Sequence, residues 1–329
     1  MRKTKEIQKD MLAATITLNP CLDRTLYIGG GLRKGEVNRA EYARLCAGGK
    51  GVNVSRMLRQ LGVFAPAYGF AGGEEGRLFE ELLKSSGIPY FLTGTACATR
   101  TCTKIVDADG LTTELNERGG PVTAEELKRL IKKSSEFAAV SLKYKKRAYL
   151  VVSGSLPEGA EPEIYRELLL ENGRMGIRCV LDADGEALKR GLEGRPWLIK
   201  PNIHELSSYV GYPLQSREGA AKVSRRIQAE YGANVLCTMG AEGAVYTDEK
   251  GCLSVSAPKV KVKGESGAGD TFLAAFLYVY EKSGGDSASA LLFAAAAAAA
   301  KIERTGSDMP GKKELLPYLQ SVYIENVTV

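Results

Sequence analysis

The sequence predicts an α/β protein with a doubly wound, mostly parallel sheet and helices on both faces. Apolar runs typical of strands alternate with helical patterns along most of the 329 residues. The predicted strands end in glycine or polar residues, and folds of this kind bind ligands at the carboxyl ends of their strands. No segment reads as a linker long enough to divide the chain, so we expect one domain over residues 1–329.

The expected elements alternate in chain order. The first residues are basic and polar, which predicts a loose N-terminal tail over 1–12. Buried strands are expected at 14–18, 148–152, 178–181, 197–199 and 234–238. Amphipathic patterns predict helices at 52–61, 78–86, 164–172 and 220–231, and the alanine-rich run at 291–300 predicts a tightly packed core helix.

Two stretches, 24–45 and 90–115, interrupt this alternation. Both have the pattern of short strands separated by turns, and neither is followed by a crossover helix. We therefore expect them to form a small β-sheet lid appended to the main sheet. Because an open strand edge invites pairing, we also expect a homodimer that forms through these lid segments.

The composition argues against several classes of function. The formal net charge is +6, aromatic residues make up 7%, and no basic block is interleaved with aromatics, so nucleic-acid binding is not expected. The apolar stretches are too short to cross a membrane. The seven cysteines contain no C-x-x-C pair, which favours free thiols in a reducing cytosol over disulfides or zinc ligands. We therefore expect a cytoplasmic protein.

The sequence Gly267-Ala268-Gly269-Asp270 comes directly before an apolar run at 272–280 that predicts a helix. Small residues leave backbone N–H groups free to face a ligand, and a helix N-terminus adds partial positive charge. Phosphoryl transfer needs such an anion hole together with a base for the incoming hydroxyl, which is a role open to Asp270. Taken alone, the tetrapeptide is more often an ordinary helix start with an acid in its first turn.

A second group of glycines and polar residues lies near the N-terminus, in T-L-N-P-C-L-D at 17–23 and A-G-G-K-G-V-N at 47–53. The glycines allow a ligand to approach closely, Lys50 offers a point charge for a phosphate, and Asp23 and Asn53 could bind sugar hydroxyls. A helix start with a solvated lysine explains these residues equally well. The Walker A spacing is absent, which argues against a P-loop kinase.

Further motifs follow these in order along the chain. The ordered set is T-L-N-P-x-x-D at 17–23, G-E-V-N-R at 35–39, A-G-G-K-G-V-N at 47–53, D-G-L-T-T-E-L-N at 109–116, S-G-S-L-P at 153–157, L-D-A-D-G-E-A-L at 181–188, K-P-N-x-x-E-L at 200–206, T-M-G-x-x-G at 238–243 and G-A-G-D at 267–270. With these motifs the chain resembles the ribokinase-like (phosphofructokinase B) family of carbohydrate kinases. Within that family it is most similar to the branch of bacterial 1-phosphofructokinases and tagatose-6-phosphate kinases.

The resemblance implies a ribokinase-like fold and a role for each matching residue. Asp270 would be the general base, and the backbone N–H groups of Gly267, Ala268 and Gly269 would form the anion hole. The residues implied to bind the sugar phosphate are Asp23, Gly48, Gly49, Lys50, Asn53, Arg100 and Ser153, with Lys50 and Arg100 facing its phosphate. The residues implied to bind ATP are Lys200, Asn202, Glu205, Thr238, Gly240 and Gly243, with Asn202 and Glu205 organising Mg²⁺ through water.

The resemblance further implies ATP-dependent phosphorylation of a ketohexose phosphate, with conversion of D-fructose 1-phosphate to fructose 1,6-bisphosphate as the first choice. Phosphorylation of tagatose 6-phosphate at its 1-hydroxyl is the alternative. More distant alternatives are a kinase of nucleosides or unphosphorylated sugars and a non-catalytic sugar-phosphate sensor. Glu265 departs from the family, which often has a small hydroxyl residue near this position, and an acid there would weaken nucleotide binding unless it turns outward.

Overall fold

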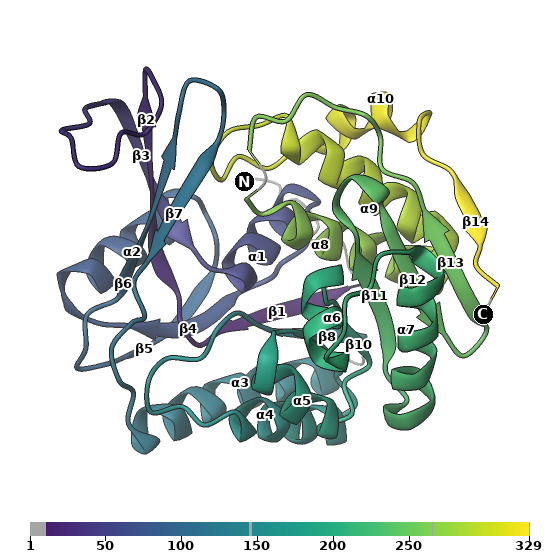
Figure 1. The fold of residues 1–329 in the computed structure, drawn as a ribbon. Helices are drawn as coiled ribbons and strands as arrows, with labels where there is room; N and C mark the ends of the chain where they lie inside the picture. Colours follow the sequence, from purple (N-terminus) through teal and green to yellow (C-terminus); the bar gives the residue numbers. More distant parts are fainter. Residues whose placement is uncertain (1–10, 145–146, 265, 329) are drawn as a thin grey trace, which may run out of the picture.

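The computed structural model describes residues 11–144, 147–264 and 266–328, which form two β-sheets and the helices packed on them (Figure 1). The strands of the larger sheet are β1 (Leu12–Thr17), β4 (Ala67–Ala71), β5 (Tyr90–Gly94), β8 (Ala148–Ser153), β9 (Arg178–Asp182), β10 (Leu198–Ile199), β11 (Asn234–Thr238), β12 (Ala244–Asp248), β13 (Gly251–Val255) and β14 (Ile324–Asn326). The strands of the smaller sheet are β2 (Cys21–Ile28), β3 (Ala40–Gly48), β6 (Arg100–Val106) and β7 (Thr112–Asn116).

The larger sheet is mostly parallel, which confirms the predicted fold class. Its strand order is β14-β13-β12-β11-β10-β9-β8-β1-β4-β5. Neighbouring strands from β11 to β5 run parallel, and an antiparallel extension of β12, β13 and β14 follows β11. The carboxyl ends of the parallel strands therefore meet at one edge of the sheet, where ligand-binding loops are expected.

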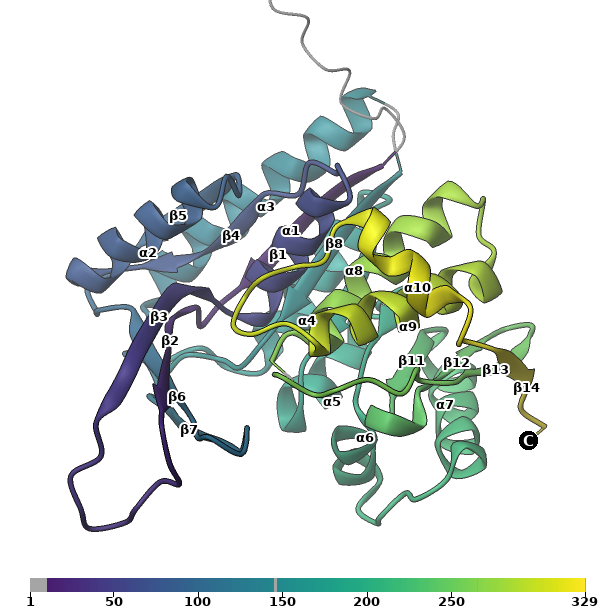
Figure 2. The same ribbon diagram turned by 90° about the horizontal axis from the view of Figure 1, so that it is seen from above.

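Helices cover both faces of the larger sheet (Figures 1 and 2). They are α1 (Lys50–Gln60), α2 (Gly73–Ser85), α3 (Ala124–Tyr144), α4 (Glu163–Arg174), α5 (Gly185–Glu193), α6 (Ile203–Val210), α7 (Arg217–Tyr231), α8 (Ala268–Lys282), α9 (Ser287–Ile302) and α10 (Leu316–Leu319). One apolar cluster packs α1, α8 and α9 on one face of the sheet. Another packs the five helices from α3 through α7 on the opposite face. Among the described residues, no helix combines the length and apolar character needed to span a bilayer.

The predicted core helix at 291–300 is confirmed as part of α9. Its alanines are mostly buried, and the helix packs along α8. Small side chains allow two helix backbones to approach closely, so the alanine run fixes α8 tightly against its neighbour. The N-terminal turn of α8 is thereby held in place by a rigid element rather than by a loop.

The smaller sheet has the order β3-β2-β6-β7 and extends away from the layered body (Figure 2). Successive side chains along each of its strands point to opposite faces of the sheet. Asp23, Lys104 and Glu114 line cavities on one face. Leu45 lies opposite Arg24, the neighbour of Asp23, and Leu115 is the neighbour of Glu114. Both leucines therefore lie on the other face, where they are 39% and 60% exposed. The sheet therefore has one polar face toward the cavities and one partly apolar outer face.

Two boundaries differ from the prediction. The segment 90–94 was expected in the lid, but it forms β5, which pairs parallel with β4 in the larger sheet. The reason is tertiary: α2 provides a crossover from β4, and Tyr90 and Leu92 pack against the apolar cluster that contains Phe79. Of the tail expected over 1–12, residues 1–10 lie outside the described residues, while β1 already begins at Leu12, two residues before the predicted strand.

Gly243 lies in the turn before β12, at a position with no room for a side chain. Its φ of 91° and ψ of −127° suit glycine alone, and an added Cβ would lie 1.9 Å from the carbonyl oxygen of Val255. We expect Gly243→Ala to lower the free energy of unfolding by at least about 3 kcal/mol. Gly232→Ala is the matched control, because Gly232 also has a positive φ but an added Cβ meets nothing within 4 Å, so about 1 kcal/mol is expected. Urea unfolding measures both values, and equal losses would contradict the steric argument.

Candidate active site

A cavity of about 1020 Å³ lies where the carboxyl ends of the parallel strands face the smaller sheet. Its wall includes the ends of β1 and β11, the segments after β8, β9 and β10, the first turns of α1 and α8, and strands of the smaller sheet. A second cavity of about 370 Å³ adjoins it and shares six lining residues, which are Asp23, Asn53, Lys104, Glu114, Val262 and Ser266. The two spaces together form one region between the two sheets.

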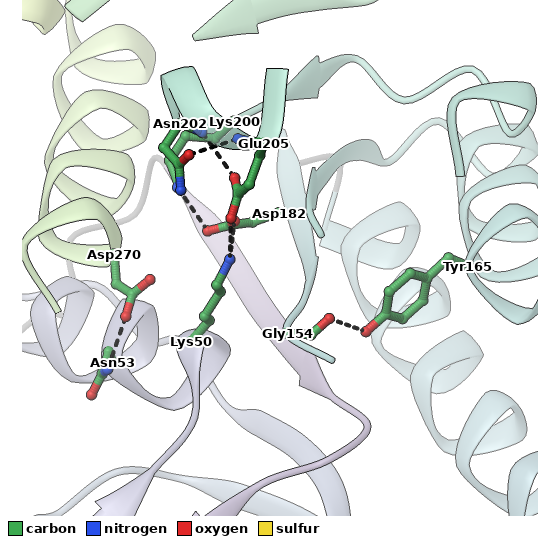
Figure 3. Close-up of polar contacts among 9 residues, drawn as sticks. All are labelled: Lys50, Asn53, Gly154, Tyr165, Asp182, Lys200, Asn202, Glu205 and Asp270. Atoms are coloured by element: carbon green, nitrogen blue, oxygen red, sulfur yellow. Dashed lines mark hydrogen bonds and ion pairs between the residues drawn. The ribbon is translucent and has the colours of Figure 1, made fainter. Parts of the chain in front are cut away.

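Asp270 lies in the first turn of α8, directly after the glycine-rich turn. Gly267 caps this helix with a φ of 78°, a left-handed conformation that favours glycine. The first N–H groups of a helix have no acceptor within it, so free donors lie beside the carboxylate. Asp270 Oδ2 accepts a hydrogen bond from Asn53 Nδ2 at 2.8 Å (Figure 3). Burial, reinforced by the Asp182 carboxylate nearby, raises the pKa of Asp270 to about 6.

Asp182, the last residue of β9, is fully buried and bridges two lysines (Figure 3). Its Oδ1 lies 3.0 Å from Lys50 Nζ, and its Oδ2 lies 3.0 Å from Lys200 Nζ. Burial alone would raise the pKa of Asp182, but the ammonium groups of Lys200 and Lys50 outweigh it and lower the pKa. No role is predicted for Asp182 from the sequence, although an acid at the end of an apolar strand is a signal for one.

Asn202 and Glu205 form a capping box at the start of α6. Asn202 Oδ1 accepts hydrogen bonds from the backbone N–H groups of His204 and Glu205, and Glu205 Oε2 accepts one from the N–H of Asn202. The other oxygen, Glu205 Oε1, lies 3.3 Å from Lys50 Nζ. These contacts fix both side chains at the rim of the cavity.

A magnesium ion would find few protein ligands at this site. In the part of the chain that the structure describes, no three His, Cys, Asp or Glu side chains are grouped to hold a metal ion. Only one carboxylate oxygen of the capping box, Glu205 Oε1, is free of backbone contacts and lies toward the cavity. Because Mg²⁺ keeps several waters and binds few carboxylates, this donor set fits an ion held through water and phosphate oxygens.

Most residues predicted to bind the sugar phosphate line the cavity. Those in the wall are Asp23, Gly49, Lys50, Asn53 and Arg100. Gly48 and Ser153 are set back behind the wall, where Gly48 ends β3 against β2 and Ser153 is fully buried at the end of β8.

The two predicted phosphate contacts are already paired. Arg100 Nε and Nη2 donate to the carbonyl oxygen of Asn19 at 3.2 and 2.9 Å, and Nη1 donates to the carbonyl oxygen of Glu117 at 2.9 Å. Lys50 contacts Asp182 and Glu205 instead of lying beside Arg100. The geometry therefore orients Arg100 by backbone acceptors and directs Lys50 toward the rim where α6 begins.

The residues predicted on the nucleotide side gather around the ends of β10 and β11. Those that line the cavity are Lys200, Asn202, Glu205, Thr238 and Gly240, and the turn of Gly267, Ala268 and Gly269 faces them. Gly243 is set back, since its Cα faces the backbone of Val255. The expectation for Glu265 falls outside the described residues.

Lys104 is a cavity residue that the sequence analysis did not select. Its Nζ contacts Asp23 Oδ2 at 2.7 Å and Ser266 Oγ at 2.6 Å. A lysine in the alternating pattern of a strand carries no local signal for such a role, and only the register of β6 against β2 brings it to the cavity.

Comparisons with known proteins relate the chain to carbohydrate kinases. A family model described as pfkB family carbohydrate kinase matches residues 16–313. The chain is 32% identical over 311 residues to a 1-phosphofructokinase from Haemophilus influenzae, which covers 94% of this chain and 97% of that protein. Two crystal structures of phosphofructokinase-2 from Escherichia coli, one in complex with fructose-6-phosphate and one of a tetrameric inhibited form, superpose with a TM-score of 0.84. Each is 27% identical to this chain and covers 94% of it and 98% of its own length.

Proposed function

Because the chain belongs to the pfkB family of carbohydrate kinases, we propose that it transfers the γ-phosphoryl group of ATP to the 6-hydroxyl of D-fructose 1-phosphate. The products are fructose 1,6-bisphosphate and ADP. The observation that carries the proposal is the buried Asp270 carboxylate at the N-terminal turn of α8, beside free N–H donors and in the wall of the large cavity. The 1-phosphofructokinase from Haemophilus influenzae, matched over nearly its whole length, supports the choice of acceptor.

In the proposed reaction, Asp270 removes the proton of the acceptor hydroxyl as its oxygen attacks the γ-phosphorus in line. The hydrogen bond from Asn53 orients the carboxylate, and burial keeps it basic enough to accept that proton. The N–H groups of Gly267, Ala268 and Gly269 stabilise the charge that develops on the phosphoryl oxygens. Positioning and electrostatics then supply most of the acceleration, as is general for phosphoryl transfer.

The nucleotide would lie along the ends of β10 and β11. Lys200, Thr238 and Gly240 would contact ATP, and the set-back Gly243 would shape the turn that holds them. Asn202 and Glu205 would hold Mg²⁺ through water, and the ion would neutralise charge on the β- and γ-phosphates. Glu205 pairs with Lys50 in the structure, so that ion pair would loosen as the phosphates arrive.

The acceptor would lie against the smaller sheet, with Asp23, Gly49 and Asn53 on its hydroxyls. We assign its phosphate to Arg100, whose planar group is held by backbone carbonyls and still borders the cavity. Lys50 is the less direct candidate, because its ammonium group must first leave Glu205. The smaller sheet would act as a lid that excludes water, which is a competing acceptor.

A second copy of the chain would pack on the outer face of the smaller sheet. Leu45 and Leu115 are exposed there, and an apolar patch on an open sheet is a typical protein contact. Phosphofructokinase-2 from Escherichia coli has a tetrameric form, which supports assembly within this family.

The acceptor is tested by coupled ADP release with Mg·ATP and five sugars: fructose 1-phosphate, tagatose 6-phosphate, fructose 6-phosphate, fructose and ribose. We expect the highest kcat/KM with fructose 1-phosphate, and Asp270→Asn should lower kcat by about 10³-fold. Glu249→Gln, on an exposed turn, is the matched control for loss of a carboxylate and should change nothing. Preference for tagatose 6-phosphate would move the acceptor but keep the mechanism, and binding without turnover would favour a sensor.

The pH profile tests the assignment of Asp270 as the base. Its pKa is raised to about 6, and the base must be deprotonated, so activity is present above this pH and is lost as the pH falls through it. We expect kcat/KM to fall about tenfold per pH unit below about pH 6, measured with a protein that remains folded by circular dichroism. An acid limb centred near pH 4 would contradict the raised pKa.

Light scattering tests the proposed dimer. The wild type should have the mass of a dimer, and Leu115→Glu should shift it toward the monomer, because a charge is costly in an apolar contact. Phe64→Glu is the matched control, since Phe64 is 43% exposed but lies outside the smaller sheet. A wild type that is an active monomer at micromolar concentration would overturn the dimer proposal.

A further inference from the structure

Lys104 makes two short polar contacts that join the two sides of the cavity. Its Nζ lies 2.7 Å from Asp23 Oδ2 in the smaller sheet and 2.6 Å from Ser266 Oγ in the segment before α8. The side chains of Lys104 and Asp23 are only 12% and 15% exposed. Ser266 directly precedes Gly267, the N-cap of α8. One ammonium group thus links strand β2 to the turn that begins the anion hole.

The register of the smaller sheet explains why Lys104 meets Asp23. In the parallel pair of β2 and β6, Asp23 lies opposite Cys102, so Lys104 is two residues further along on the same face. In the antiparallel pair of β6 and β7, Lys104 lies opposite Glu114. Lys104 therefore has two carboxylates as neighbours within the sheet, and Ser266 approaches from outside it.

The two oxygens of Asp23 have different surroundings. Oδ2 accepts from Lys104, whereas Oδ1 is buried and has no hydrogen-bond partner among the described residues. A buried carboxylate oxygen without a donor costs free energy, so it is a ready acceptor for a ligand hydroxyl. Lys104 occupies one oxygen and leaves the other without a donor.

Lys104 keeps its charge in this environment. Burial opposes the ammonium form, but the Asp23 carboxylate, together with Glu114, outweighs it and raises the pKa of Lys104. The contact to Asp23 is therefore an ion pair, while Ser266 Oγ accepts a hydrogen bond from the charged group.

We propose that Lys104 is a positioning residue that sets the Asp23 carboxylate at a fixed place relative to the anion-hole turn. This inference rests on the proposed function, in which Asp23 binds acceptor hydroxyls. The acceptor is held by Asp23 and the phosphoryl group by the turn after Ser266. Lys104 contacts both Asp23 and Ser266, so it fixes the distance between the acceptor and the phosphoryl group. A small misplacement of these reacting groups is costly in rate.

The expected kinetic effect is specific to the acceptor. In Lys104→Met, Asp23 loses the one ion-pair partner that it has among the described residues, so its carboxylate turns away and its hydrogen bond to the acceptor weakens. We expect the KM for fructose 1-phosphate to rise at least about tenfold and kcat to fall by a similar factor, with the KM for ATP changed less than twofold. Lys104→Arg retains the charge and should recover part of the loss.

Matched variants distinguish the contact of Lys104 with Asp23, its contact with Ser266 and a general effect on the fold. Ser266→Ala keeps the ion pair with Asp23, so it should lower kcat with little change in the KM for fructose 1-phosphate. Lys84→Met, at an exposed position of α2, is the control for loss of a lysine and should leave all constants unchanged. Thermal unfolding of each variant should show a cooperative transition, which excludes misfolding as the cause.

The decisive measurement is a double-mutant cycle of Lys104→Met and Asp23→Asn. If Lys104 acts through Asp23, the double variant should be no worse than Asp23→Asn alone in kcat/KM for fructose 1-phosphate. Multiplied losses would overturn the proposal, because Lys104 would then contact the ligand independently. Unchanged constants in Lys104→Met, with an active wild type, would overturn it as well and leave the proposed function intact.

Calorimetric titration with fructose 1-phosphate distinguishes the two kinds of failure. If the wild type binds this sugar phosphate but shows no turnover, the kinase proposal fails, and the same cycle is then measured in Kd. Coupled losses of affinity in Lys104→Met and Asp23→Asn would still support Lys104 as the residue that positions Asp23. Independent losses, or no binding by the wild type, would overturn it.

Discussion

The Asp182 carboxylate at the end of β9 is the interaction on which the geometry of the cavity depends. It is fully buried, so its charge is stable only because Lys50 and Lys200 approach it from two directions. Lys50 begins α1, and Lys200 lies between β10 and the capping box of α6. One carboxylate therefore ties the start of α1 and the segment before α6 to the sheet. Its charge also reaches Asp270 and contributes to that residue's raised pKa.

The fold was predictable because its signals are local. Buried strands followed by or ending in polar residues, such as 178–181 before Asp182 and 234–238, predict a parallel sheet with its ligand edge at those ends. The structure has the parallel strands, and a cavity lies at that edge. The glycine-rich turn before Asp270 predicts a helix start, and α8 begins there. The limits of the smaller sheet were not predictable in the same way. Whether the 90–94 strand joins one sheet or the other depends on its packing beside α2, which no local pattern records.

The charge pairs in the cavity could not be predicted from the sequence, for a related reason. Lys50 and Asp182 are 132 residues apart, and Lys104 and Asp23 are 81 apart, so only the completed topology brings them together. Residue type and motif position predicted that Lys50 carries a useful charge, but not which carboxylate it meets. In contrast, the contacts of Asn202 and Glu205 lie within one helical turn, and their N-x-x-E spacing is itself the pattern of a capping box.

The mutual pairing of lysines and carboxylates also determines how strongly the cavity attracts ions from a distance. Lys50, Lys104 and Lys200 each lie within 3.0 Å of a carboxylate oxygen, so their fields largely cancel beyond a few ångströms. These three lysines would therefore add little to the diffusional approach of anionic ligands, despite the formal charge of +6. Their contribution to binding would arise after contact, when phosphate oxygens exchange places with the carboxylates, and it would depend only weakly on ionic strength. Arg100 differs, because carbonyl oxygens orient it without cancelling its charge.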